Sequence, residues 1–263
     1  MHRTCKIVFE GLYKGRITME ANTENKADKN RGCLYGIGVG PGDPEYLTLK
    51  AVRLVNECEY IAVPNAVRQE SAAYQIAVQA IPELGRQSSD RHWLELPMPM
   101  TKDIQEWHSY HKKAAEKIAV ILEKGKNVAF LTLGDPTVYS TYMYIDRLIA
   151  QLGYRTEIIN GVPSFCAAAG RLGQALSVKE EQIHIIPANY DMELALSMPG
   201  TKVFLKVGRR LSELKRLLRS KQCTAEVREI FMVENCGMEG ERCYVGLEQI
   251  PEEAGYFSIV MIK

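Results

Sequence analysis

The sequence predicts an α/β fold with two lobes, a mostly parallel sheet in the first lobe and a mixed sheet in the second. Two observations carry this prediction. Up to about residue 160, apolar runs that end at Gly or Pro alternate with helical patterns, as in parallel sheets with crossover helices. Beyond that point several apolar runs are joined by short polar turns such as 235–240, which are typical of hairpins and antiparallel pairing.

The chain is expected to divide into an N-terminal extension (1–32), a first α/β lobe (33–161) and a second α/β lobe (162–263). Residues 21–32 are almost wholly polar or charged, and such a stretch cannot bury enough apolar surface to offset the entropy lost on ordering. At 263 residues the chain is long enough for two cores of ordinary domain size. We therefore expect two lobes rather than one large core.

In the first lobe, strand and helix patterns alternate in chain order. In the first helix, Leu47, Ala51, Leu54 and Val55 fall on one face, as amphipathic packing requires. Strands are expected at 34–39, 60–63, 93–96, 128–133 and 156–160, and helices at 47–57, 72–80, 104–123 and 139–152.

The second lobe opens with a helix of small residues around 167–170, which could approach a sheet or another helix closely. Its strands are expected near 183–186, 202–206, 227–233, 242–245 and 256–262, and its helices near 192–197 and 211–219.

Two glycine-aspartate-proline turns, 38–44 and 134–136, directly follow predicted strands. Open α/β sheets bind ligands beside such strand ends, and we expect the site in the cleft between the lobes. Pro41 stands where a dinucleotide motif needs its third glycine, and residues 42–44 lack the Gly-Lys-Ser/Thr ending of a phosphate loop. An acidic tip would also repel an anion. Either turn alone would be explained by tight-turn geometry, but two such turns after two strands indicate a ligand site. The acidic residue in the turn favours a neutral or cationic ligand for this site.

The charge balance, 33 Lys+Arg against 32 Asp+Glu, does not favour a nucleic acid or an anionic membrane as partner. No apolar run approaches the length of a membrane span or a signal-peptide core. The seven cysteines include no Cys-x-x-Cys pair, so neither a disulfide framework nor a structural metal site is expected. Reduced thiols fit a cytoplasmic protein.

None of the five histidines is assigned a catalytic role. His108 and His111 share one face of a charged helical pattern, which favours a solvated surface over a metal pair.

Residues 33–263 resemble the tetrapyrrole methylases, the S-adenosylmethionine-dependent enzymes of corrin and sirohaem synthesis. The resemblance rests on four segments in the family's order and spacing: Gly38–Ala51, Leu133–Pro136, Gly161–Phe165 and Phe204–Gly208. Within the family, Gly134–Ile145 is most similar to the precorrin-2 or cobalt-factor II C-20 methyltransferases. The chain departs from the family's pattern at Asn160, where proline is usual, and at Pro163, where a hydroxyl residue is usual.

The resemblance implies the tetrapyrrole methylase fold in a homodimer, with S-adenosylmethionine in the interlobe cleft, held largely by backbone groups. Carried over by motif, the cofactor contacts would be Pro41, Leu133, Gly134, Asp135, Val138, Pro163, Ser164, Ala188, Leu205 or Lys206, and Asn235 or Cys236. The tetrapyrrole pocket would be bordered by Gly40, Gly42 and Asp43 of the first turn, while Tyr139 and Tyr142 either line this pocket or pack.

Physical chemistry fits this assignment, because acidic and carbonyl-rich turns suit a sulfonium cation. Methyl transfer is an in-line displacement that alignment and desolvation can accelerate, and no catalytic base or metal ligand is assigned. The expected acceptor is precorrin-2 or cobalt-factor II. The sequence does not determine which residues bind the acceptor's carboxylates, and Arg53, Arg68, Arg91 and Arg209 are candidates only. The alternatives are a sister methylase acting at another ring position, or a non-catalytic module that binds S-adenosylmethionine or a nucleotide.

Overall fold

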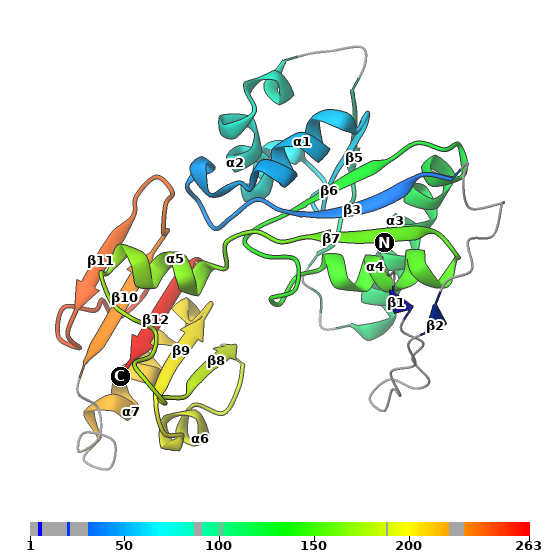
Figure 1. The fold of residues 1–263 in the computed structure, drawn as a ribbon. Coiled ribbons are helices and arrows are strands. Elements are labelled where there is room, and N and C mark those ends of the chain that lie inside the picture. The colour runs from blue at the N-terminus through cyan, green and yellow to red at the C-terminus, as the bar shows by residue number, and fades with distance from the viewer. Residues whose placement is uncertain are drawn as a thin grey trace.

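The computed structural model describes most residues of both lobes. Of the first thirty residues, it describes only two short strands. β1 (Cys5–Lys6) and β2 (Glu20–Ala21) pair with each other in antiparallel orientation. The other described residues are 31–86, 91–99, 101, 103–187, 189–220 and 229–263. Within these ranges two five-stranded sheets form two lobes, as Figure 1 shows.

The sheet of the first lobe is wholly parallel, in the strand order β5-β4-β6-β3-β7. Every residue of its central strand β6 is buried, as expected for a strand covered on both faces. The strands are β3 (Cys33–Gly38), β4 (Tyr60–Val63), β5 (His92–Glu95), β6 (Val128–Thr132) and β7 (Arg155–Ile159).

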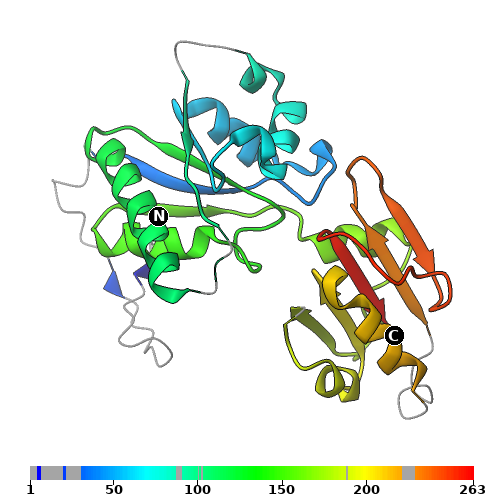
Figure 2. The same ribbon diagram turned by 180° about the vertical axis from the view of Figure 1, so that it is seen from behind.

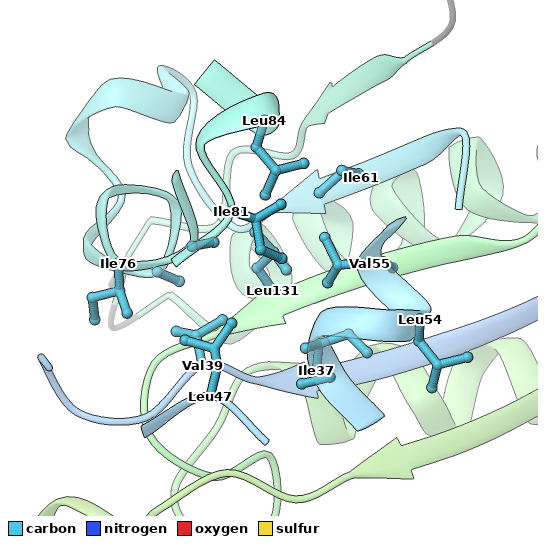
Figure 3. Close-up of a cluster of buried hydrophobic side chains, with 14 of the residues drawn as sticks. Ile37, Val39, Leu47, Leu54, Val55, Ile61, Ile76, Ile81, Leu84 and Leu131 are labelled. Carbon is cyan, nitrogen blue, oxygen red and sulfur yellow. The ribbon is translucent and has the colours of Figure 1, made fainter. Parts of the chain in front are cut away.

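Two pairs of helices cover the two faces of this sheet. The first face packs against α1 (Leu49–Glu57) and α2 (Ala72–Ala80). Figure 3 shows this core, with Val55 of α1 near the strand residues Ile61 and Leu131 and with Ile76 of α2 at the edge of the cluster. The other face packs against α3 (Ile104–Glu123) and α4 (Tyr142–Gln151). The short helices η2 (Pro44–Tyr46), η3 (Arg68–Glu70) and η4 (Pro82–Gly85) belong to loops on the α1 and α2 side.

The sheet of the second lobe is mixed, in the strand order β11-β10-β12-β9-β8, with β8 and β9 parallel and the other pairs antiparallel. Its strands are β8 (Ile183–Pro187), β9 (Thr201–Leu205), β10 (Ile230–Glu234), β11 (Arg242–Val245) and β12 (Ser258–Ile262). One face packs against α5 (Ser164–Arg171), and the other against α6 (Met192–Ser197) and α7 (Leu211–Arg219), which follows η5 (Gly208–Arg210). Figure 2 shows these helices on opposite sides of the sheet.

The predicted fold class, with a parallel sheet in the first lobe and a mixed sheet in the second, is confirmed. The small-residue helix α5 faces this sheet, because Ala167 and Ala168 belong to the same buried cluster as Val203 and Leu205 of β9.

Two helix starts differ from the sequence-based expectation, each by two or three residues. α1 begins at Leu49 rather than at residue 47, because the Thr48 hydroxyl accepts a hydrogen bond from the Ala51 N–H and caps the helix. α4 begins at Tyr142 rather than at residue 139, because Tyr139 has a φ of 47° and so cannot continue a right-handed helix.

Candidate functional site

Three turns meet at the carboxyl ends of β6, β3 and β7, which are neighbours in the first sheet. The turns after β3 and β6 are joined by an isolated bridge in which Gly40 and Gly134 exchange backbone hydrogen bonds of 3.2 and 2.8 Å. Gly40 and Gly134 have φ values of 78° and 70°, which side-chain-bearing residues rarely adopt. The geometry of the bridge therefore explains why glycine stands in both turns.

The third turn packs its backbone directly against the other two. A Cβ atom placed on Gly161 would lie 2.3 Å from the carbonyl oxygen of Gly134, and one on Gly38 would lie 2.5 Å from the backbone nitrogen of Gly161. A Cβ atom on Gly134 would meet nothing closer than Ser164 N and Val162 O, both at 4.0 Å. Gly134 thus lies beside an open cradle between the second and third turns, which a side chain would fill.

The Asp135 carboxylate connects the second and third turns. Its Oδ1 accepts hydrogen bonds from the backbone N–H of Thr137 (2.8 Å) and from the Thr137 hydroxyl (2.5 Å), and its Oδ2 accepts from Asn160 Nδ2 (3.0 Å) and the Gly161 N–H (3.1 Å). Burial alone would raise the pKa of Asp135, but these four hydrogen bonds outweigh it and lower the pKa below its usual value. Asp135 is therefore a buried anion whose oxygens are engaged by the protein itself.

The end of the second turn reaches the second lobe. Val138 packs against the cluster formed by α5 and the second sheet, and the Tyr139 hydroxyl donates a hydrogen bond to the Ile185 carbonyl of β8 at 3.2 Å. Tyr139 is 52% exposed, whereas Tyr142 is fully buried against Phe130 and the backbone of Gly36. The sequence did not decide whether Tyr139 and Tyr142 line the pocket or pack in the core, and the structure shows that Tyr142 packs in the core.

On the second-lobe side, two sequence-predicted residues have positive φ, Lys206 with 59° and Asn235 with 52°. Together with Tyr139 they are three of the four non-glycine residues with positive φ in the described part of the chain. Strained backbone of this kind clusters at functional sites. Leu205, next to Lys206, is buried, and the Lys206 ammonium lies 5.3 Å from the centre of the Tyr256 ring.

The first turn contacts the loop after β10. A Cβ atom on Gly42 would lie 2.2 Å from the Cys236 carbonyl oxygen, and one on Gly237 would lie 2.5 Å from the Asp43 nitrogen, so the two backbones touch across the lobes. Beside this contact lies a pocket of about 230 Å³, lined by Asp43, Tyr46, Arg171, Cys236, Gly237, Met238 and Glu241. Burial raises the pKa of the Cys236 thiol to about 11, so the thiol is protonated at neutral pH.

The remaining predicted cofactor residues occupy two places. Pro41 is buried in the first turn, while Leu133, Pro163 and Ser164 are half-buried beside the cradle, where Pro163 accepts hydrogen bonds from the first turn of α5. Ala188 lies outside the described residues.

The prediction of a solvated histidine face is wrong for His111. His108 is exposed, but His111 is only 3% exposed, its ring centre lies 3.9 Å from that of Trp107, and Tyr144 of α4 contacts it from the other helix. Sequence reasoning also missed the roles of Thr137 and Asn160 as donors to Asp135. The signal for Asn160 was the departure from the family's proline at this position, and the signal for Thr137 was its place two residues after an aspartate.

Within the described ranges, no cluster of three or more His, Cys, Asp or Glu side chains has an arrangement that could hold a metal ion. In the same part of the chain, no helix has the length and apolar character needed to cross a membrane.

The sequence matches the family model described as Tetrapyrrole (Corrin/Porphyrin) Methylases over residues 33–251. It is 31% identical over 234 residues to a probable cobalt-precorrin-2 C(20)-methyltransferase of Methanocaldococcus jannaschii, which covers 88% of this chain and 95% of that protein. It is 28% identical to a precorrin-2 C(20)-methyltransferase of a Sinorhizobium species, with the same coverage.

Among solved structures, the fold is similar to that of uroporphyrin-III C-methyltransferase from Thermus thermophilus, determined in complex with S-adenosylhomocysteine. The TM-score is 0.60 at 23% identity, and the match covers 88% of this chain and 97% of that one.

Proposed function

Since the chain belongs to the tetrapyrrole methylase family, we propose that it transfers a methyl group from S-adenosylmethionine to C-20 of precorrin-2, or of its cobalt-containing form, in cobalamin biosynthesis. The reaction is the one named for the relatives from Methanocaldococcus jannaschii and Sinorhizobium. The cofactor is supported by the similar Thermus thermophilus structure, which holds the demethylated product.

The observation that carries the proposal is the cradle beside Gly134. Its rim consists of backbone groups of the second and third turns, including Ser164 N and Val162 O. None of the three turns, 38–44, 133–138 and 160–164, contains a basic residue, and one carries the buried anion of Asp135. A cation is attracted to such a site, and bound S-adenosylmethionine would supply a methyl group made electrophilic by its sulfonium.

The protein's own residues would act by orientation and by excluding water. Interlobe contacts such as the Tyr139–Ile185 hydrogen bond hold the turns of the first lobe against the second sheet. A methyl donor and acceptor bound between them would be aligned and shielded from water, and these two effects supply most of the acceleration of a methyl transfer. The high pKa of Cys236 keeps its thiol protonated, so it does not compete with the acceptor carbon for the methyl group.

The test is to incubate the protein anaerobically with S-adenosylmethionine carrying a carbon-13 methyl group, and to offer precorrin-2 and its cobalt form separately. We expect a new methyl signal at C-20 with at least one acceptor. A methyl group at another carbon would support a sister methylase. Binding of the cofactor with no transfer to either acceptor would support a binding module.

A further inference from the structure

The four arginines that are candidates for binding the acceptor's carboxylates differ in their location and in their bonding partners. Arg53 is paired with Glu57 on the exposed side of α1, at 2.9 Å. Arg91 precedes β5, so it lies at the amino-terminal edge of the parallel sheet, where its Nη2 donates to Asn56 at 2.9 Å. Arg209 is exposed in η5 of the second lobe. Arg68 follows β4, and so it lies at the carboxyl edge with the three turns.

In the described part of the chain, the Arg68 guanidinium contacts aromatic rings and not a carboxylate. Its central carbon lies 5.4 Å from the centre of the Trp93 ring and 6.0 Å from that of Tyr74. The Nε atom is buried without a hydrogen-bond partner, and no ion pair neutralises the guanidinium among the described residues. The nearby Glu95 carboxylate instead accepts from the backbone N–H of Arg68 at 3.1 Å and so fixes the loop. Within the described ranges, the terminal nitrogens of Arg68 make no hydrogen bond or ion pair.

The loop that carries Arg68 adjoins the elements of the candidate site. η3 packs against α2, and α2 packs against η2, whose Tyr46 lines the interlobe pocket together with Asp43. Figure 1 shows the loop with η2 lying between α2 and the second lobe. β4 is also the direct neighbour of β6, the strand that ends at the Gly134 cradle.

We propose that Arg68 binds a carboxylate of the tetrapyrrole acceptor, an assignment that rests on the function proposed above. Corrin precursors carry acetate and propionate side chains, and a guanidinium binds a carboxylate through two parallel N–H···O bonds. Contact with the Trp93 and Tyr74 rings restrains the guanidinium before the ligand arrives, which reduces the entropy lost on binding.

The experiment compares wild-type protein with Arg68→Ala and Arg68→Lys, and uses Arg53→Ala as the matched control. Calorimetry measures the Kd of S-adenosylhomocysteine and, separately, of sirohydrochlorin as the free acid and as its methyl ester. Melting temperatures verify that each variant is folded.

We expect Arg68→Ala to weaken binding of the free acid at least tenfold, or about 1.4 kcal/mol, while the Kd of S-adenosylhomocysteine stays within twofold. The Kd of the free acid should be intermediate between wild type and Arg68→Ala for Arg68→Lys, and should equal the wild-type value for Arg53→Ala. The ester, which has no anion to bind, should show the same Kd with wild type and Arg68→Ala. Unchanged binding of the free acid by a folded Arg68→Ala protein would overturn the assignment alone, whereas wild-type protein that bound no S-adenosylhomocysteine would contradict the proposed function itself.

Discussion

The side-chain amide of Asn160 donates a hydrogen bond to the Asp135 carboxylate at 3.0 Å and so links two turns that are 25 residues apart in the chain. The Gly161 N–H reinforces this link on the same oxygen, while Thr137 engages the other oxygen. Because these bonds occupy both oxygens, Asp135 acts on the cradle beside Gly134 by fixing the shape of the backbone around it. Any contact that Asp135 makes to a cofactor is therefore expected from its main chain.

Replacing Asn160 with Ala should weaken the cradle without abolishing it, because the Gly161 N–H still binds Asp135. We expect a loss of about 1 kcal/mol in unfolding free energy, below the usual range for a hydrogen bond to a charged group because Asn160 is exposed. We also expect severalfold weaker binding of S-adenosylhomocysteine by calorimetry. A double-mutant cycle with Asp135→Ala isolates the pair, and additive effects in that cycle would contradict the link.

The strands and most helices could be predicted from the sequence because their signal is local. The run at 128–133 is apolar except for Thr132, and its residues 128–132 form a central, wholly buried strand. Ala51, Leu54 and Val55 recur at helical spacing and are buried together. Local patterns failed where a single backbone angle decides the outcome. The periodicity after Pro136 extends through Tyr139, but the left-handed conformation of that residue delays α4 until Tyr142.

The turns of the candidate site could be located from the sequence, but the contacts that shape them could not. Nothing in the local sequence indicates that Asn160 faces Asp135, since the pairing depends on β6 and β7 flanking β3 in the folded sheet. The burial of His111 was missed for the same reason. Its own helix is rich in charged residues, and the cover comes from Tyr144 on α4, which packs against α3.

Replacing Gly134 with Val should weaken S-adenosylhomocysteine binding at least tenfold, or roughly 1.4 kcal/mol, because the side chain would enter the cradle. The positive φ of Gly134 also strains any residue with a Cβ atom, so Gly134→Ala serves as the control for backbone strain. Calorimetry on protein shown to be folded by its melting curve provides the measurement. Wild-type affinity in folded Gly134→Val protein would place the cofactor elsewhere.

We expect an obligate homodimer, on the family resemblance and on the apolar side chains that the second lobe exposes. Among these Val178, Leu194 and Val245 are each at least half exposed. Sedimentation at low micromolar concentration should give twice the chain mass of 29.6 kDa. A monomer that retained full methyl-transfer activity at the same concentration would count against this prediction.

The His111 side chain is buried in its neutral form on α3. Its Nδ1 donates to the Trp107 carbonyl at 2.7 Å, which leaves Nε2 as the unprotonated nitrogen, and Nε2 is buried without a partner. Burial lowers the pKa of His111; the hydrogen bond to Trp107 opposes this effect, and the neighbouring His108 adds to it. Protonation of the folded protein would therefore place a charged, unpaired N–H in the packed layer between α3 and α4.

The stability of the protein should fall as the solution is acidified below pH 6.5, the ordinary pKa of histidine. Because the pKa of His111 is lower in the folded than in the unfolded state, the unfolded chain binds more protons in this range, and the free energy of unfolding decreases with falling pH until the folded pKa is reached. Well above pH 6.5 the unfolded chain is deprotonated at this residue as well, so His111 contributes no slope there. His111→Phe keeps a ring against Trp107 and cannot take up a proton, so its denaturant midpoint should change less between pH 7.5 and pH 5.5 than that of wild type. His108→Gln, at an exposed site of the same helix, removes only the smaller contribution of His108 and keeps the burial of His111, so it should retain most of the wild-type change. Equal changes in wild type and His111→Phe would show that other groups produce the acid sensitivity.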